Sequence, residues 1–234
     1  MNLTKILCFL GTLLFLSHPM LAQKFLIVAH GPFDVDLVRE YQKDRITIAL
    51  DGAANEFYDW GLTPDLISGD MDSILEKVKL YFEKQAVQFF ETHDQNYTDL
   101  EKSLKYCLNN YATDIVILCA LGGGRSDHTF HNAALLKRYH DQNVSITLVN
   151  FNESIRFLRD ETITLSGPIG SALGLFGFPK AIATTQGLQW EMNDYPLELA
   201  IQESVANRFK TSLVTITVKG EALLVAPRTP VLKE

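Results

Sequence analysis

The sequence predicts an α/β protein with an N-terminal open, mostly parallel α/β/α sheet, followed by a smaller antiparallel β-sandwich of jelly-roll type. Two observations predict this fold class. Short apolar runs alternate with helix-like segments between residues 24 and 149. After about residue 151, short alternating segments appear instead, separated by Gly and Pro. The chain has 234 residues, 47% hydrophobic and 21% charged, which is enough for a medium domain and a smaller one.

The first predicted domain covers residues 23–151. Compact apolar runs indicate buried strands at 24–29, 45–50, 64–69, 114–121 and 144–149, and an edge strand at 87–90. Amphipathic spacing indicates helices at 34–42, 53–60, 73–84 and 127–139, and a further helix that begins at Thr98. Thr98 and Glu101 match a capping box, in which each side chain binds a free backbone N–H of the first turn. The alternation predicts parallel strands covered by helices on both faces.

The second predicted domain covers residues 152–234. Its expected strands are short and lie at 155–158, 162–165, 171–176, 182–185, 212–218 and 221–225. Long amphipathic segments are absent there, which favours antiparallel pairing.

Residues 1–22 can be interpreted in two ways. Lys5 and the apolar run at 6–16 resemble a secretory signal peptide, although Met20 stands where a small residue is preferred before cleavage. The run is too short to span a membrane, so we expect no stable membrane association. In the second interpretation Met20 is the initiator. A cytoplasmic location is expected if translation starts there, and export through the segment is the alternative.

Charge and cysteine content exclude some functions. The net charge is −7, so no electrostatic reason exists to expect binding to nucleic acid. The three cysteines show no CxxC spacing. We interpret Cys107 and Cys119 as buried structural thiols, while Cys8 lies in the signal-like segment.

Four motifs stand where a predicted strand gives way to a helix. Carboxylates and glycines recur in them: Asp51, Gly52 and Asn55; Asp70 and Asp72; Thr98 and Asp99; Gly124, Arg125, Asp127 and His128. Parallel strands gather such junctions in one crevice at their carboxyl ends. Carboxylates suit Mg²⁺, and a glycine turn before a helix suits phosphate. Together the motifs favour a crevice for a magnesium-bound polyphosphate, without a P-loop motif.

Each motif alone also has a structural explanation. Asp70 and Asp72 lie on one face only if the backbone is extended there, and otherwise serve as turn or N-cap residues. Helix capping accounts for Thr98, and the helix dipole accounts for Asp99. Arg125 is also explained as a solvated side chain, and His128 as a structural one.

Taken together, the motifs resemble those of the thiamine pyrophosphokinase family. The matching segments are residues 51–55 (DGAAN), 64–73 (PDLISGDMDS), 98–102 (TDLEK), 123–128 (GGRSDH), 184–190 (TTQGLQW) and 204–207 (SVAN). They cover almost the whole chain after residue 22 and occur in the family's order. Ala53 stands in place of a glycine, and Asn96 in place of a common aspartate.

The resemblance implies transfer of a diphosphate group from ATP to the hydroxyethyl group of thiamine by a homodimer. It implies Mg²⁺ on Asp70, Asp72 and Asp99, and catalysis by these three residues with Asp51. The implied ATP contacts are Asp51, Gly52, Asn55, Thr98, Gly124, Arg125, Asp127 and His128. The implied thiamine contacts are Trp190, Ser204 and Asn207, although a buried core role explains Trp190 equally well. The alternatives are a diphosphokinase for another small alcohol and a secreted, non-catalytic binder of thiamine or nucleotide.

Overall fold

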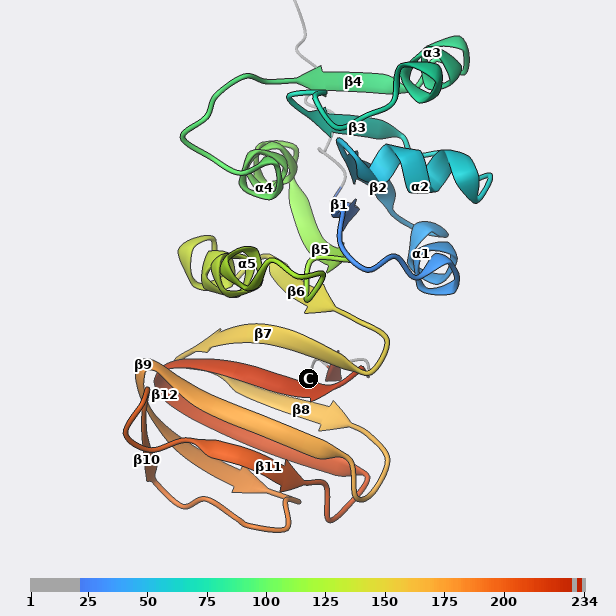
Figure 1. Ribbon diagram of the computed structural model, residues 1–234. Coiled ribbons are helices and arrows are strands. Elements are labelled where there is room, and N and C mark those ends of the chain that lie inside the picture. Colours follow the sequence, from blue (N-terminus) through green and yellow to red (C-terminus); the bar gives the residue numbers. More distant parts are fainter. Residues whose placement is uncertain (1–21, 229–230, 233–234) are drawn as a thin grey trace, which may run out of the picture.

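The fold is described from a computed structural model, which covers residues 22–228 and 231–232. The signal-like segment, apart from Ala22, lies outside the described residues. Figure 1 shows helices and strands alternating in the N-terminal part and strands alone in the C-terminal part. Among the described residues, no helix is both long and apolar enough to cross a membrane.

Six parallel strands form the N-terminal half of the sheet, in the order β4-β3-β2-β1-β5-β6. Their bounds are β1 Gln23–Val28, β2 Ile46–Leu50, β3 Leu66–Gly69, β4 Gln88–Glu91, β5 Ala112–Leu118 and β6 Ser145–Val149. The predicted strands are confirmed to within a few residues, and β4 lies at the sheet edge as predicted. The chain moves outward from β1 to β4 and then returns to the other side of β1. The strand order therefore reverses between β1 and β5.

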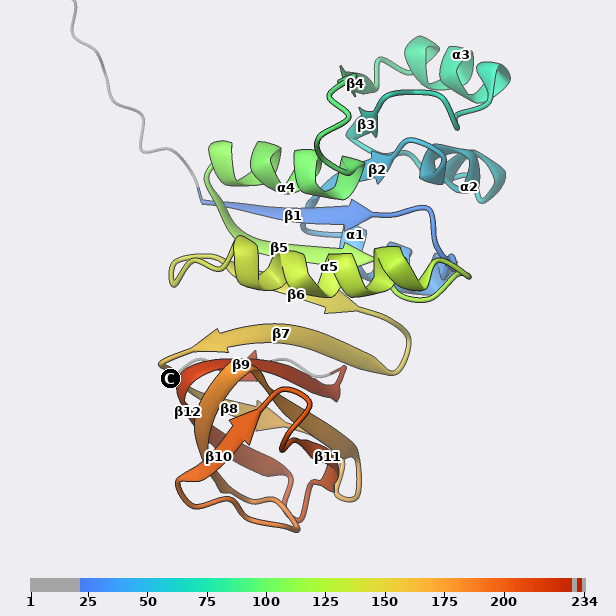
Figure 2. The same cartoon turned by 60° about the vertical axis from the view of Figure 1, so that its left-hand side comes forward.

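The helices cover both faces of these strands because of that reversal (Figure 2). One core cluster packs α1 (Val35–Gln42), α2 (Ala53–Asp59) and α3 (Glu76–Lys84) against the sheet. Another packs α4 (Asp99–Asn109) and α5 (Ser126–Arg138) on the opposite face. Cys107 and Cys119 are buried free thiols, as predicted.

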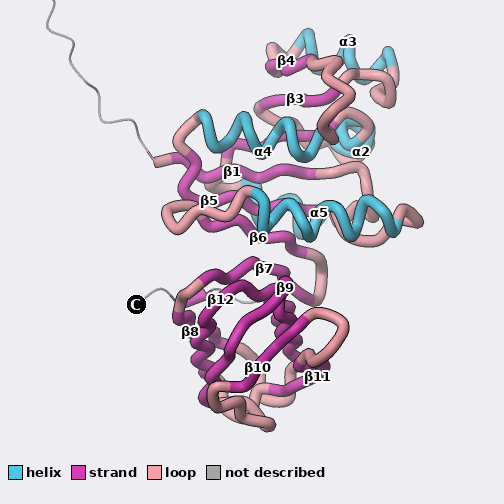
Figure 3. Tube along the Cα trace, turned by 90° about the vertical axis from the view of Figure 1, so that its left-hand side faces the viewer, coloured by secondary structure: helices cyan, strands magenta, loops and turns pink. Residues whose placement is uncertain are grey.

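The C-terminal half begins where β7 turns back antiparallel to β6. Figure 3 shows its strands folding over a core of their own, without helices. Their bounds are β7 Glu153–Arg159, β8 Thr162–Ser166, β9 Ala172–Gln186, β10 Tyr195–Glu198, β11 Ser204–Arg208, β12 Leu213–Pro227 and β13 Val231–Leu232. Because β7 pairs with both β6 and β12, the thirteen strands in the described part of the chain belong to one hydrogen-bonded sheet.

The strand divisions predicted for this half were partly wrong. The segments at 171–176 and 182–185 are one strand, β9, and those at 212–218 and 221–225 are one strand, β12. These two strands pair along most of their length, with a register shift beside Gly220 that keeps the ladder continuous. The short strands β10 and β11 were missed. Both are edge strands with largely exposed residues, so they lack a strong apolar pattern.

Helix α3 starts at Glu76, three residues later than predicted. Ser73 and Ile74 do not belong to it, because Leu75 has an extended backbone, with φ −69° and ψ 137°. The backbone N–H groups of Ser73 and Ile74 donate to the carboxylate of Asp51. Asp51, which lies 22 and 23 positions earlier in the sequence than these two residues, thus holds the segment that precedes α3.

Glu101 connects α4 with α5. Its carboxylate is almost fully buried and accepts hydrogen bonds from Arg138 Nη1 at 2.8 Å and Tyr139 Oη at 2.7 Å. Only half of the predicted capping box forms: Thr98 Oγ1 accepts the N–H of Glu101, but the Glu101 side chain turns to α5. Burial raises the pKa of Glu101, but the bonds from Tyr139 and Arg138 outweigh it, and the net pKa is lowered.

Glu101→Gln is expected to destabilise the protein by about 2 kcal/mol at neutral pH, because it replaces charge-assisted hydrogen bonds. The lowered pKa in the folded state means that the ionised carboxylate adds stability above the ordinary glutamate pKa. This stability is lost as pH falls through the lowered value. Urea unfolding at a series of pH values should therefore show that the free energies of unfolding of the wild type and of Glu101→Gln become equal in acid. Glu83→Gln, on the exposed surface of α3, is the control. A difference in free energy of unfolding between the wild type and Glu101→Gln that does not change with pH would contradict the lowered pKa of Glu101.

Candidate active site

A cleft of about 350 Å³ lies at the carboxyl ends of β1, β2 and β5. It occupies the place where the strand order reverses, which is where open α/β sheets bind ligands. Residues from all four predicted motifs line it, including Asp51, Gly52, Ser73, Thr98, Asp99, Arg125 and His128. The structure therefore brings together motifs that are more than 70 residues apart in the sequence.

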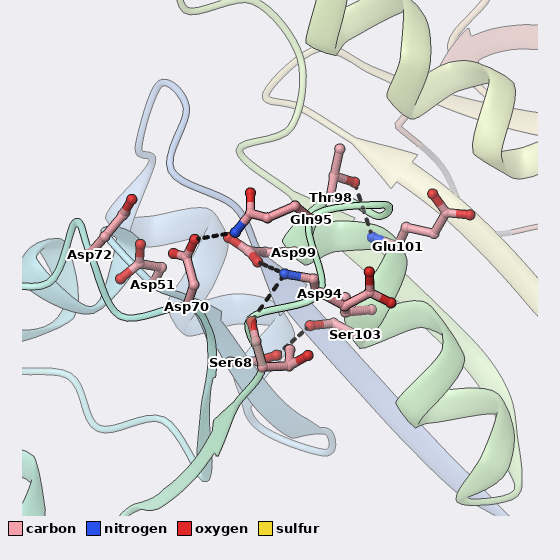
Figure 4. A network of polar contacts seen from close by, with 12 residues as sticks. Asp51, Ser68, Asp70, Asp72, Asp94, Gln95, Thr98, Asp99, Glu101 and Ser103 are labelled. Atoms are coloured by element: carbon pink, nitrogen blue, oxygen red, sulfur yellow. Dashed lines mark hydrogen bonds and ion pairs between the residues drawn. The ribbon is translucent and has the colours of Figure 1, made fainter.

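Three carboxylates meet beside this cleft. Asp51, Asp70 and Asp99 each offer an oxygen, and these oxygens lie within 4.8 Å of one another. The residues follow β2, follow β3 and begin α4, respectively, as Figure 4 shows. A Cβ on Gly69 would lie 2.8 Å from Asp51 Cβ and 3.3 Å from Asp99 Oδ2, so a side chain there would fill the space between them. The open space and the hard oxygen donors fit a magnesium ion.

Asp72 lies outside this group of three. Met71 has a φ of +63°, so the segment is not extended, and Asp70 and Asp72 do not share a strand face. Asp72 Oδ1 instead accepts a hydrogen bond of 2.8 Å from Ser73 Oγ. In Figure 4 its side chain is drawn on the outer side of Asp51. Among the described residues the third carboxylate of the group is Asp51, whereas the sequence suggested Asp72.

Asp51 and Asn55 hold the segment that carries Asp70. Asp51 accepts the N–H groups of Ser73 and Ile74, each at 3.0 Å. Asn55 donates to the carbonyl of Ser73 and accepts the N–H of Leu75, both at 2.9 Å. Burial raises the pKa of Asp51 above its ordinary value, and the nearby Asp72 adds to this. Both the NH2 donor and the carbonyl acceptor of the Asn55 side chain are thus engaged in positioning the segment.

Two polar residues that sequence reasoning did not assign complete the cluster. Gln95 Nε2 donates to Asp70 Oδ2 at 3.3 Å (Figure 4). Lys102 Nζ is buried and lies 3.1 Å from Asp99 Oδ1 and 3.2 Å from the carbonyl of Thr92. Burial raises the pKa of Asp70, but Gln95 and the charge of Lys102 contribute to lowering it overall. The spacing of Asp99 and Lys102, three positions apart at the start of a helix, could have revealed this pair.

The opposite side of the cleft carries the glycine turn. Gly122, Gly123 and Gly124 have φ values of +80°, +81° and +80°, and α5 starts directly after Arg125. Arg125 forms a double hydrogen bond with Asp127, at 2.9 and 2.8 Å, on the exposed surface. This bond from Arg125 lowers the pKa of Asp127. A phosphate would therefore have to compete with Asp127 for the guanidinium.

The predicted thiamine contacts lie together on the C-terminal half. Trp190, Ser204 and Asn207 line a shallow cleft of about 250 Å³. Asn207 is buried, accepts the N–H of Trp190 at 3.2 Å and donates to its carbonyl at 2.7 Å. The side chain of Trp190 is 56% exposed, which excludes the alternative that it is a buried core residue.

Comparison with known proteins agrees with this arrangement. The family model "Thiamin pyrophosphokinase, catalytic domain" matches residues 37–148, and "Thiamin pyrophosphokinase, vitamin B1 binding domain" matches residues 160–223. Thiamine pyrophosphokinase 1 of Oryza sativa subsp. japonica is 30% identical over 213 residues, covering 78% of this chain and 79% of that protein. The chain belongs to the thiamine pyrophosphokinase family.

Solved structures support the same fold. Thiamine pyrophosphokinase from Bacillus subtilis superposes with a TM-score of 0.78 at 23% identity, covering 88% of this chain and 99% of that one. The yeast thiamin pyrophosphokinase superposes with a TM-score of 0.77 at 20% identity, covering 90% and 88%. The predicted arrangement of a parallel α/β half and an antiparallel half is thus confirmed.

The two departures from the family motifs have different surroundings. Ala53, the first residue of α2, is fully buried in the core and does not line the cleft, so its methyl group does not narrow the cleft. The glycine that the cleft needs is Gly52, where a Cβ would lie 2.3 Å from the His30 ring. Asn96 donates through both its backbone N–H and its side chain to Asp94 Oδ1, at 2.9 and 2.8 Å.

Lys102→Met is expected to loosen residues 92–97, because it leaves Asp99 and the carbonyl of Thr92 without their cationic donor. Hydrogen exchange of these residues should rise several-fold, while exchange in the core strands stays unchanged. Lys84→Met, on the exposed end of α3, is the matched control. Unaltered exchange at 92–97 in the Lys102 variant would show that the ammonium group does not hold the segment.

Proposed function

We propose that this chain transfers a diphosphate group from ATP to the hydroxyethyl group of thiamine, giving thiamine diphosphate and AMP. One observation carries the proposal: the family's catalytic half places three carboxylates and a glycine turn around a single cleft. The match of the second half to the vitamin B1 binding domain supports thiamine as the acceptor.

The reaction requires attack on the β-phosphorus of ATP. A bond forms between the thiamine hydroxyl oxygen and this phosphorus, and the bond from the phosphorus to the oxygen bridging it to the α-phosphate breaks. AMP leaves with that bridging oxygen. The hydroxyl proton passes to a carboxylate of the cluster, Asp70 or Asp99, either directly or through water.

We assign a magnesium site to the cluster, with Asp70 and Asp99 as ligands and Asp51 beside them. Asp72, which the sequence suggested as a ligand, lies near Asp51 but outside this group of three. When bound, Mg²⁺ neutralises phosphate charge and orients the phosphoryl groups. Lys102 and Gln95 hold Asp99 and Asp70 in place for this role.

We assign the polyphosphate to the cleft between the cluster and the glycine turn. Gly124 and the first turn of α5 offer backbone N–H groups, and Arg125 offers a guanidinium that can bind two oxygens. Asp127 pairs with Arg125 until phosphate replaces it. Gly52, Thr98 and His128 form the adjoining walls, and Asn55 contributes by holding residues 73–75.

We assign thiamine to the cleft of Trp190, Ser204 and Asn207. The exposed indole of Trp190 can stack on a cationic heterocycle. Asn207 fixes the backbone of Trp190, so its contribution is to position the ring.

A homodimer is part of this proposal. Apolar side chains are exposed around β10 and β11, namely Tyr195, Leu199, Ile201 and Val205. They adjoin the Trp190 cleft, which Tyr195 and Val205 also line. An exposed apolar patch of this kind marks a protein interface. Thiamine would then bind between the patch and the catalytic half of the partner protomer.

A cytoplasmic location follows if the protein starts at Met20, since the reaction consumes ATP. Export through residues 1–22 is the alternative, and it would favour a secreted binder without catalysis. Sequencing of the native N-terminus separates the two: a mature protein from an extracytoplasmic fraction beginning at Gln23 would count against the kinase.

The direct test is AMP release from ATP and Mg²⁺ by protein that starts at Met20. We expect release with thiamine and little with other small primary alcohols. Turnover with another alcohol but not with thiamine would favour a different diphosphokinase. Binding of thiamine without AMP formation would favour the non-catalytic binder.

Asp70→Asn and Asp99→Asn are each expected to lower turnover by about 100-fold or more, because each removes a charged oxygen from the proposed metal site. Binding of Mn²⁺, followed by electron paramagnetic resonance, should weaken in parallel. Asp72→Asn is expected to keep more of the metal affinity than Asp99→Asn. An equal loss of Mn²⁺ affinity in Asp72→Asn and Asp99→Asn would mean that Asp72 is a metal ligand.

Trp190→Ala is expected to raise the KM for thiamine by about tenfold through loss of ring stacking, with a smaller effect on the KM for ATP. Trp190→Phe keeps an aromatic ring and should recover part of the loss. An unchanged KM for thiamine in the alanine variant would remove Trp190 from the proposed site.

A further inference from the structure

A second large groove lies away from the candidate active site. It has a volume of about 750 Å³ and shares no lining residue with the cleft. The strands β5, β6 and β7 form its floor, and the end of α1 and Arg228 border it.

The strand sequences explain why this face is open. Ile115 and Ile117 of β5 and Ile146 and Leu148 of β6 pack in the core cluster that contains α5. The alternate positions, including Asp114, Ser145 and Thr147, therefore face the other way and line the groove. Val116 and Val149 on this same face pack in the core cluster of α1, α2 and α3, and the polar residues lie on the part of the face that these helices leave open.

The groove has more cationic than anionic lining groups. Lys24, Arg45, Arg156 and Arg228 line it, with only Glu40 and Asp114 as carboxylates. Three of the cations have carboxylate partners within 2.9 Å: Lys24 with Asp44, Arg45 with Asp44 and Asp114, and Arg228 with Glu40.

Arg156 is the exception. Within residues 22–228 and 231–232 it forms no ion pair, and its Nε is buried without a hydrogen-bond partner. Burial lowers the pKa of Arg156, which Glu161 and Asp114 partly counteract. Both carboxylates are engaged elsewhere: Asp114 binds Arg45, and Glu161 accepts the N–H of Arg159. A half-buried guanidinium whose Nε is fully buried and which has no close anion favours an anionic ligand.

Three hydroxyl groups line the same groove beside this guanidinium. They belong to Ser145, Thr147 and Ser154, and Thr147 is the direct cross-strand neighbour of Arg156. In the described part of the chain none of the three hydroxyls forms a hydrogen bond. The groove thus offers a forked cation and three free O–H donors on adjacent strands.

A second cleft, of about 350 Å³, also borders Arg156. It is lined by Asp141, Asp160 and Glu161, with Arg159 as its other arginine. Three carboxylates would repel an anion, so the open sheet face is the favoured side for one.

We propose that the groove on the β5–β6–β7 face binds a phosphorylated small molecule, with its phosphate on Arg156, Ser145, Thr147 and Ser154. A guanidinium and several hydroxyl donors match the number of acceptor oxygens on a phosphate better than the two of a carboxylate. The apolar surface of Tyr41, Val116 and Val149 would contact the rest of the molecule. The site is independent of the proposed diphosphate transfer.

The test is a titration of the full chain with phenyl phosphate, inorganic phosphate and benzoate, followed by methyl NMR. Phenyl phosphate should shift the methyl signals of Val116 and Thr147 at millimolar concentration. Inorganic phosphate should bind more weakly because it lacks a ring, and benzoate should bind more weakly because it lacks the phosphate. Benzoate binding as tightly as phenyl phosphate would overturn the phosphate assignment.

Arg156→Leu should weaken phenyl phosphate binding at Val116 by at least about tenfold, the usual effect of losing a charged hydrogen bond. Arg156→Lys should weaken it less. If the leucine variant does not fold, the Ser145→Ala/Thr147→Val double variant provides the same test. Arg125→Ala is the matched control: it removes a cation of the cleft and should leave the Val116 shift intact. Shifts confined to the cleft, or unchanged affinity in the groove variants, would overturn the proposal.

Discussion

The carboxylate of Asp51 fixes the geometry on which the candidate active site depends. It is buried at the end of β2 and accepts two backbone N–H groups from the segment after β3. These bonds hold the irregular segment that precedes α3. That segment brings Asp70 to within reach of Asp99. Asn55 supports it with two further hydrogen bonds. A residue that appeared to be a ligand contact is therefore also the structural base of the cluster.

Electrostatics explains how three carboxylates can lie so close together. Asp51 is stabilised by backbone N–H groups, Asp99 by the buried ammonium group of Lys102, and Asp70 by the amide of Gln95. Each carboxylate thus has a donor of its own, which reduces mutual repulsion. A divalent cation would add the remaining positive charge. Lys102 and Gln95 therefore belong to the functional argument, although neither carries a negative ligand atom.

The two halves of the molecule share one sheet but serve separate purposes. The parallel half provides a crevice because its strand order reverses between β1 and β5. The antiparallel half presents Trp190 on a surface that Asn207 holds in shape. On the face of β6 opposite α5, Val149 packs in the cluster of α1, α2 and α3, and polar residues and Arg156 occupy the part that these helices leave open. The open groove is thus a consequence of joining the two halves through β6 and β7.

The sequence by itself determined the fold class, the order of the parallel strands along the chain, the N-cap at Thr98 and the motifs that identify the family. These features depend on apolar periodicity and on residues close together in the chain, so they can be read locally. Tertiary structure alone decided that Asp51 rather than Asp72 joins Asp70 and Asp99, because Met71 takes a left-handed conformation and the N–H groups of Ser73 and Ile74 bind a residue more than 20 positions away. It also decided the lengths of β9 and β12, whose pairing continues past residues that interrupt the apolar pattern. The composition of the carboxylate group and the lengths of these two strands depend on contacts between distant segments, which a local sequence pattern does not predict.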